Sequence, residues 1–139
     1  MTQEAVSKLL DTDKNVRLIY KEYPILGPDS IQGSKAALAS VKQGKYMKFH
    51  DTLMNTKGHL SSEIILTVAK ETGLDVEKLK EDMADDSIER TTHANVVLAG
   101  EIGARGTPAF VIGEQMFGGA MKYEQMQQAV EDARQKQRK

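Results

Sequence analysis

The spacing of apolar residues predicts a chain made mostly of helices. Apolar side chains recur at intervals of three and four residues along most of the sequence, which places them on one face of a helix. A short helix is expected at 2–10, and a last helix, basic at its end, begins near Tyr123. Five more are expected between them, at 29–43, 45–55, 61–72, 75–83 and 86–102. Their predicted N-caps include Asp29, Ser61 or Ser62, and Asp75.

Strand patterns occur in two places only. Residues 16–20 alternate apolar and polar positions in a β-rich run, which predicts one strand. Later, 109–112 and 115–117 flank the dipeptide Gly113-Glu114, which predicts a β-hairpin with a type II′ turn. The resulting order is helix, strand, five helices, hairpin, helix. This order indicates a mixed α/β layer with an inserted helical block.

Length and charge exclude several classes of protein. A chain of 139 residues has the size of one domain. Its 19 basic and 20 acidic residues nearly cancel, which argues against nucleic acid as a partner. No apolar run is long enough for a membrane span. The N-terminus shows neither the basic nor the apolar region of an export signal.

Candidate chemistry is sparse. The chain has no cysteine, which excludes disulfides, thiolate metal sites, cysteine nucleophiles and dithiol redox chemistry carried by this chain alone. The spacing of His50, His59 and His93 matches no ligand motif, so no metal site and no cofactor are predicted. The acidic pairs at 81–82 and 85–86 are interpreted as solvated helix caps.

One motif has two interpretations. The run from Gly106 to Gly113 places Thr107 and Pro108 at the entry of the first hairpin strand. A proline there can simply make a rigid strand entry, since it need not donate to the ladder. Alternatively, a cis peptide bond leaves the Thr107 backbone free to pair with an extended ligand.

Four separated segments resemble the DsbA-like thioredoxin-fold oxidoreductases, in the branch of the Com1-type and disulfide isomerase proteins. They are Tyr20-Lys-Glu-Tyr-Pro-Ile-Leu-Gly-Pro-Asp-Ser30, Ala36-Ala37-Leu38, Gly44-Lys-Tyr-Met-Lys-Phe-His-Asp51 and Gly106-Thr-Pro-Ala-Phe-Val-Ile-Gly113. The resemblance implies a thioredoxin-like α/β fold, helix-rich with a small sheet. It also implies a single domain over 1–139 with a helical insertion at about 29–103.

The resemblance assigns Thr107 and Pro108 to the substrate-facing cis-proline loop. No catalytic residue carries over, because family members place a strand and Cys-x-x-Cys before the helix that 1–10 resembles. We therefore expect an N-terminally truncated domain whose strand and cysteines would lie upstream of Met1. Extended polypeptides are the implied substrates, and the periplasm or another exported location is the implied compartment.

Three functions follow from these expectations. The first is a fragment of a thiol–disulfide oxidoreductase, redox-inactive by itself. The second is a redox-dead, chaperone-like module that binds extended peptides, and the third is a helical adaptor. In the family sheet the absent strand lies between 16–20 and 109–112. Because unpaired strand edges are costly, we expect a second chain to complete the sheet in a homo-oligomer.

Overall fold

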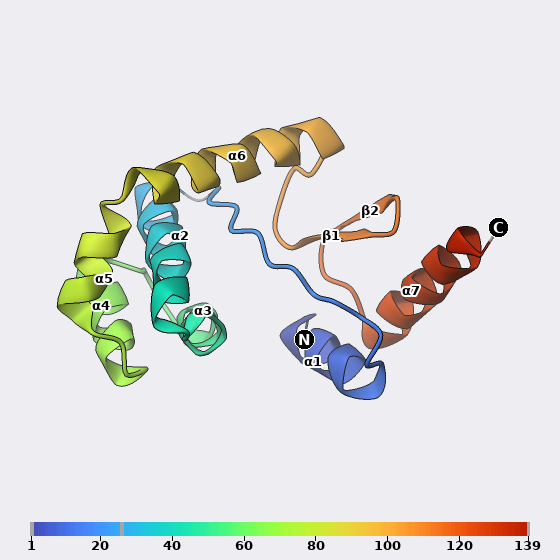
Figure 1. Cartoon of the computed structure of the whole chain (residues 1–139), viewed down its shortest axis with the longest axis horizontal. Coiled ribbons are helices and arrows are strands. Elements are labelled where there is room, and N and C mark those ends of the chain that lie inside the picture. The colour runs from blue at the N-terminus through green and yellow to red at the C-terminus, as the bar shows by residue number, and fades with distance from the viewer. Residues whose placement is uncertain (1, 26, 139) are drawn as a thin grey trace. The chain divides into compact units, whose positions relative to one another are not determined.

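A computed structural model describes residues 2–25 and 27–138 of the chain. The chain divides into two compact units (Figure 1). The helical unit is Lys21–Leu98, and the sheet unit comprises Met1–Tyr20 and Ala99–Lys139. Each unit has its own hydrophobic core. The helix-rich architecture with one small sheet agrees with the fold class expected from the sequence.

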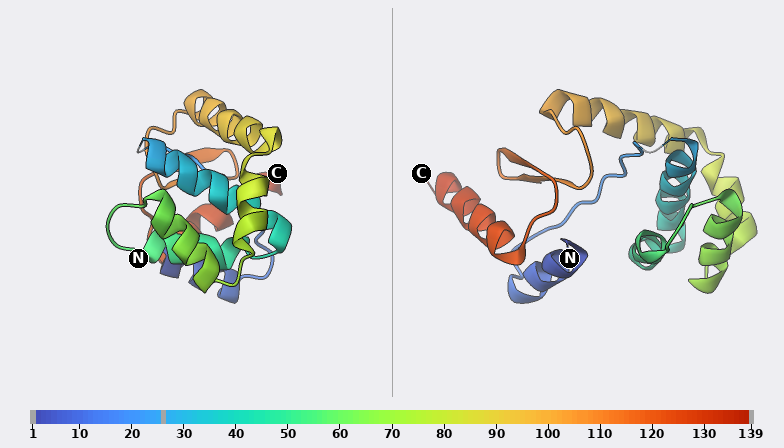
Figure 2. Two further views of the ribbon diagram at one scale, coloured as in Figure 1. Left: turned by 90° about the vertical axis from the view of Figure 1, so that its left-hand side faces the viewer. Right: turned by 180° about the vertical axis from the view of Figure 1, so that it is seen from behind.

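The helical unit contains the five predicted helices. They are α2 (Pro28–Ser40), α3 (Tyr46–Asn55), α4 (Ser62–Glu71), α5 (Val76–Met83) and most of α6 (Asp86–Ile102). Helix α2 contacts α3, α4 and α5, as the left panel of Figure 2 shows. Its alanines allow this close approach, and larger side chains from the neighbouring helices fill the remaining space. The core consists of Ala36, Ala37, Ala39, Phe49, Leu53, Ile65, Val68, Ala69, Leu74, Leu79 and Ile88.

Two predicted N-caps are confirmed and one is wrong. Ser61 accepts a hydrogen bond from the Ile64 amide, and Asp75 accepts one from the Lys78 amide. Asp29 does not cap α2, because the helix begins earlier, with Gly27 at the cap position and a proline at the first helical residue. Proline suits that position since its fixed φ is helical and its missing N–H needs no partner. The end predicted at Gly44 is correct, after a 3₁₀ turn at Val41–Gln43.

The sheet unit contains α1 (Thr2–Thr12), the hairpin of β1 (Ala109–Ile112) and β2 (Gln115–Gly118), and α7 (Tyr123–Gln137). Helices α1 and α7 pack together around a second core. The Arg134 guanidinium donates two hydrogen bonds to Asp13, at 2.7 and 2.8 Å, and lowers the pKa of that carboxyl. The buried residues of this core are Ala5, Val6, Leu9, Met121, Met126 and Ala129.

The predicted strand at 16–20 does not form. Val16 and Leu18 pack against the core of the sheet unit while Arg17 and Ile19 are exposed, so the alternation is real. However, this segment has no ladder partner among the described residues, and the described sheet contains β1 and β2 alone. Alternation fixes which side chains face the core, whereas a strand also requires a neighbour that accepts and donates its hydrogen bonds.

The predicted hairpin is confirmed. Strands β1 and β2 are antiparallel, and Ile112 pairs with Gln115 across the two-residue turn. Gly113 has a φ of 63°, while no non-glycine residue in the described chain has a positive φ. This combination fits the type II′ turn that the sequence predicts.

Helix α7 also approaches the hairpin closely at Gly113. A Cβ atom at Gly113 would lie 2.8 Å from the Ala133 Cβ, and the positive φ adds backbone strain.

We therefore expect Gly113→Ala to lower the free energy of unfolding by about 1–3 kcal/mol. The matched control is Gly100→Ala in α6, where φ is ordinary and the space is open. The control should be neutral or stabilising by about 0.5–1 kcal/mol. Chemical denaturation checks both, and equal effects of the two substitutions would contradict this packing.

Candidate functional site

The loop between α6 and β1 exposes the residues that the sequence marked as a candidate site. Thr107 and Pro108 are exposed, Gly106 is half-buried, and the Thr107–Pro108 peptide bond is cis. The loop is fixed at both ends. The Ala104 amide donates to the Ala99 carbonyl at the end of α6, and the Gly119 amide donates to the Pro108 carbonyl at 2.9 Å.

Thr107 is exposed, and its backbone groups make no hydrogen bond to any residue that the structure describes. Within the described part of the chain, neither its amide nor its carbonyl has a hydrogen-bond partner, although both neighbouring segments are ordered by such bonds. A free backbone N–H and C=O just before the start of a strand can form hydrogen bonds with the extended backbone of another polypeptide. The loop thus presents an exposed residue whose backbone groups are not used by the other described residues.

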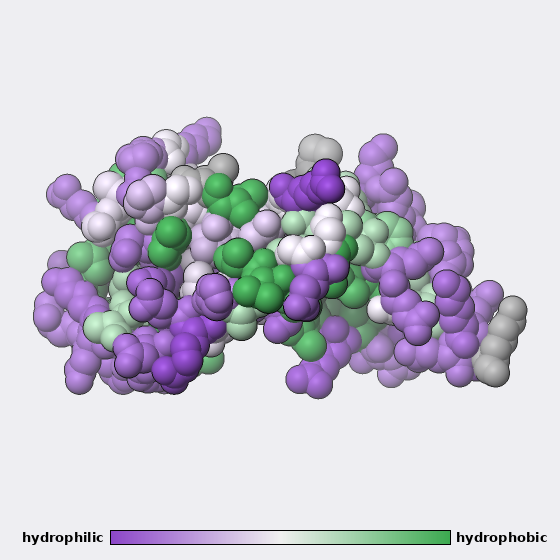
Figure 3. All heavy atoms as spheres, turned by 90° about the horizontal axis from the view of Figure 1, so that it is seen from above, coloured by the Kyte–Doolittle hydropathy of each residue, from purple (hydrophilic) through white to green (hydrophobic). Residues whose placement is uncertain are grey.

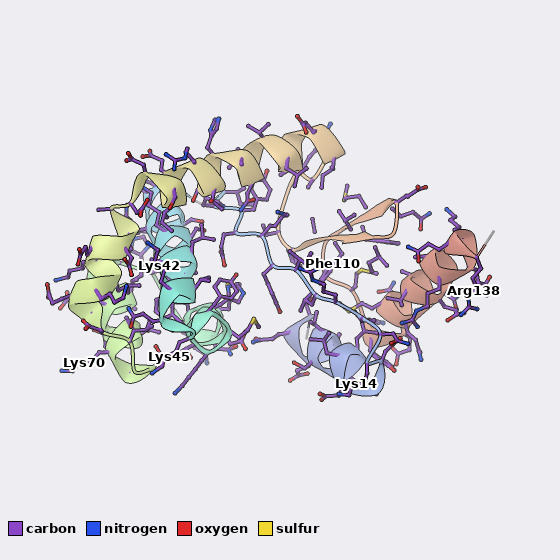
Figure 4. All side chains as sticks on the ribbon, in the orientation of Figure 1. Lys14, Lys42, Lys45, Lys70, Phe110 and Arg138 are labelled. Carbon is purple, nitrogen blue, oxygen red and sulfur yellow. The ribbon has the colours of Figure 1, made fainter. Side chains whose placement is uncertain are left out.

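The outer edge of β1 continues this open backbone. The register pairs Phe110 with Phe117, and the Pro108 carbonyl bonds across to the next strand. Because antiparallel residues alternate in direction, the N–H and C=O groups of Ala109 and Val111 point away from β2. No described strand pairs with them. The side chain of Phe110, labelled in Figure 4, packs against the core of the sheet unit and anchors the strand.

The site carries no group suited to acid–base or nucleophilic chemistry. Thr107 and Pro108 are neutral, and the chain has no cysteine that could attack a disulfide. Among the described residues, no group of three or more histidines and acidic residues is arranged to hold a metal ion. The geometry supports binding through the backbone.

The histidines lie in separate places. His50 is on α3 and bonds to Glu22, His59 lies before α4 and pairs with Asp29, and His93 is exposed on α6. The interpretation of the acidic pairs as solvated helix caps is wrong for Asp82, which is buried within α5 and pairs with Lys78 and Lys42. It holds for Asp85. Asp85 accepts the Ser87 amide, which lowers the pKa of its carboxyl to about 2.

Sequence analysis missed one cluster of polar residues. The carboxylate of Glu22 accepts hydrogen bonds from Tyr46 and His50 of α3, and its backbone carbonyl accepts one from Asn95 of α6. Only the i, i+4 spacing of Tyr46 and His50 is visible as a local pattern. The other contacts join positions far apart in the sequence, so no local signal predicts them.

The remaining surface offers few alternatives. The face shown in Figure 3 is mostly hydrophilic, with hydrophobic residues interspersed among the hydrophilic ones. On α6, the side chains of Val96, Val97 and Leu98 are exposed. A hollow on the helical unit is lined by Val41 and residues 44–48, without histidine or carboxylate. In the described parts of the chain, no helix combines the length and apolar character that crossing a bilayer requires.

Comparison with known proteins agrees with the fold that the sequence predicts. The family described as "DSBA-like thioredoxin domain" matches residues 1–131. A thioredoxin-like oxidoreductase from Silicibacter pomeroyi is 40% identical, with a TM-score of 0.93 over 96% of this chain and 78% of that one. The thiol-disulfide exchange protein alpha-DsbA2 from Wolbachia pipientis is 30% identical, with a TM-score of 0.86 over 94% of this chain and 72% of that one. The catalytic domain of Proteus mirabilis ScsC is 28% identical, with a TM-score of 0.82 over 94% and 73%.

Two curated relatives are larger proteins of another kind. The Na(+)/H(+) antiporters NhaA 1 of Salinispora arenicola and NhaA 3 of Salinispora tropica are 27% and 26% identical over 133 residues. The match covers 94% of this chain but 20% of each antiporter. The chain thus spans about a fifth of their length. Because the family match extends over almost the whole sequence, the chain belongs to the DSBA-like thioredoxin domain family.

Proposed function

We propose that this chain is the polypeptide-binding body of a DsbA-like thiol–disulfide oxidoreductase, and that it binds extended substrates at Thr107 and Pro108. The family is one of oxidoreductases, but the chain contains no cysteine and has no redox chemistry of its own. Binding is the part of the family's activity that these residues retain. Within a protein that supplied a Cys-x-x-Cys, the loop would present the bound polypeptide to that dithiol.

The observation that carries the proposal is the exposed, unpaired backbone of Thr107. An extended peptide can use this amide and carbonyl without regard to its own side chains. Backbone pairing therefore suits a protein that accepts many unfolded substrates. The neutral side chains of Thr107 and Pro108 impose no charge preference on the bound segment.

The outer edge of β1 supports a second part of the proposal. An open strand edge is a template for pairing with another chain. We therefore propose that a strand from a second copy of the chain pairs with the edge at Ala109 and Val111. In this proposal each copy is a single thioredoxin-like domain with a helical insertion at about 29–103. Thr107 precedes the strand, so its backbone stays available to substrate. An exported, periplasmic location is part of the proposal, since disulfide exchange belongs to oxidising compartments.

The test is a binding measurement with a short, uncharged, cysteine-free peptide that is unfolded in solution. Thr107→Arg places a long side chain over the proposed binding position. It should raise the dissociation constant of the peptide about tenfold, which is a loss of about 1.4 kcal/mol in binding free energy. Thr67→Arg is the matched control, because Thr67 is exposed on α4 of the helical unit. It should change the dissociation constant less than about twofold. Equal affinity of the two variants would exclude Thr107 from the binding site.

A further inference from the structure

The polar cluster around Glu22 joins three separate segments of the helical unit. The Glu22 Oε1 atom accepts the Tyr46 hydroxyl at 2.5 Å and lies 3.0 Å from His50 Nδ1. Its Oε2 atom lies 3.4 Å from the Ser34 hydroxyl of α2. The Asn95 amide of α6 donates to the Glu22 backbone carbonyl at 2.9 Å. One residue of an extended segment is thereby bonded to α2, α3 and α6.

These contacts are well sheltered from water. The side chain of Glu22 is 13% exposed and that of His50 is 19% exposed. The Tyr46 and His50 rings stack with their centroids 5.4 Å apart, which covers one face of the imidazole. In such surroundings a hydrogen bond between charged partners is stronger than at the open surface.

The cluster lies where the chain enters and leaves the helical unit. Glu22 is the second residue of the unit, and Asn95 lies three residues before its last residue, Leu98. Figure 1 shows the segment after residue 20 reaching α6. The bond from Asn95 to Glu22 ties these two ends of the unit to each other, and the Glu22 side chain ties them to α3.

The charges around His50 favour its protonated form. The hydrogen bond to Glu22 raises the pKa of His50 most strongly, burial opposes this, and the charges of Glu22 and Asp51 raise it further. From α2 and α6, the groups that contact Glu22 are the neutral side chains of Ser34 and Asn95. The carboxylates of Glu22 and Asp51 both act on the imidazole in the direction that favours its charged form.

We propose that Glu22, Tyr46, His50 and Asn95 form a pH-sensitive clasp, which holds the two ends of the helical unit together while His50 is protonated and loosens when His50 loses its proton. The neutral imidazole can still donate one hydrogen bond, but the ion pair with Glu22 is lost. Since the pKa of His50 is higher in the folded state, its stabilisation is complete below its ordinary pKa of about 6.5. It is lost as the pH rises through the folded value. This inference is independent of the polypeptide-binding proposal.

The direct test is a histidine NMR titration with amide hydrogen exchange on the intact chain. The chain has three histidines, so single His→Gln variants assign the signals. We expect His50 to titrate above the ordinary histidine pKa of about 6.5. Exchange at 21–25 and in the second half of α6 should accelerate as the pH rises past the His50 midpoint, beyond the intrinsic pH dependence of exchange. A His50 midpoint at or below the ordinary histidine value of about 6.5 would overturn the proposal.

Variants separate the clasp from general packing. His50→Gln keeps a polar side chain at this position but removes the group that titrates. In this variant the amides at 21–25 should be protected from exchange to the same degree at every pH, once the intrinsic pH dependence of exchange is corrected for. His93→Gln is the matched control and should retain the wild-type pH profile. Glu22→Gln should move the His50 midpoint toward lower pH. If His50→Gln retains the wild-type profile, the clasp does not control these segments.

Discussion

Phe49→Ala should remove about 3–5 kcal/mol from the free energy of unfolding of the helical unit. Phe49 is fully buried in α3, at the centre of the core that α2, α4 and α5 also form. Removing its ring deletes apolar burial and leaves a cavity, because the neighbouring helices can close only part of the space. Since whole domains have about 5–15 kcal/mol of stability, this single change should bring the unit close to unfolding.

The matched control is Met54→Ala on the same helix. The Met54 side chain is 68% exposed, so truncating it should change the stability by less than about 0.5 kcal/mol. Hydrogen exchange of the α2–α5 amides measures both variants within the helical unit, whatever the sheet unit does. Similar losses for Phe49→Ala and Met54→Ala would mean that the core does not lie where the structure places it.

The second large expected effect is that the purified chain catalyses no thiol–disulfide exchange. The family's chemistry depends on a thiolate that attacks a disulfide sulfur, and this chain has no cysteine to supply one. In an insulin reduction assay, the purified chain should leave the rate at that of dithiothreitol alone. In dithiol oxidation, it should likewise leave the uncatalysed rate unchanged.

A DsbA-like oxidoreductase with an intact Cys-x-x-Cys is the positive control for both assays. Turnover by the 139-residue chain above the reagent background would contradict the account. It would require a redox group that no residue of this sequence provides.

Local signals predicted the helices well because each helix end depends on nearby residues. Ser61 and Asp75 cap the amides three residues ahead, and Gly44 ends its helix with a positive φ. Asp29 failed as a cap for an equally local reason. Pro28 starts α2 one residue before Asp29, and a proline at the first helical position competes with the capping-box interpretation.

Non-local features could not be predicted in the same way. The burial alternation at 16–20 is present, but a strand depends on a partner from elsewhere, and the described chain pairs none with it. The cluster of Glu22, Tyr46 and Asn95 joins positions that are distant in the sequence. Thr107 and Pro108 stand in one continuous motif, so the sequence could single them out. Their role as binding residues comes from the resemblance rather than from the spacing, and it stays a prediction.

The central claim is that a chain without a dithiol still binds extended polypeptide at the α6–β1 loop. An amide NMR titration with the uncharged, cysteine-free peptide tests it most directly. We predict saturable shifts that are largest at Gly106 and Thr107 and weaken along β1, with the core of the helical unit unaffected. Unchanged amides at Gly106 and Thr107 at saturating peptide, or shifts centred on another surface, would contradict the claim.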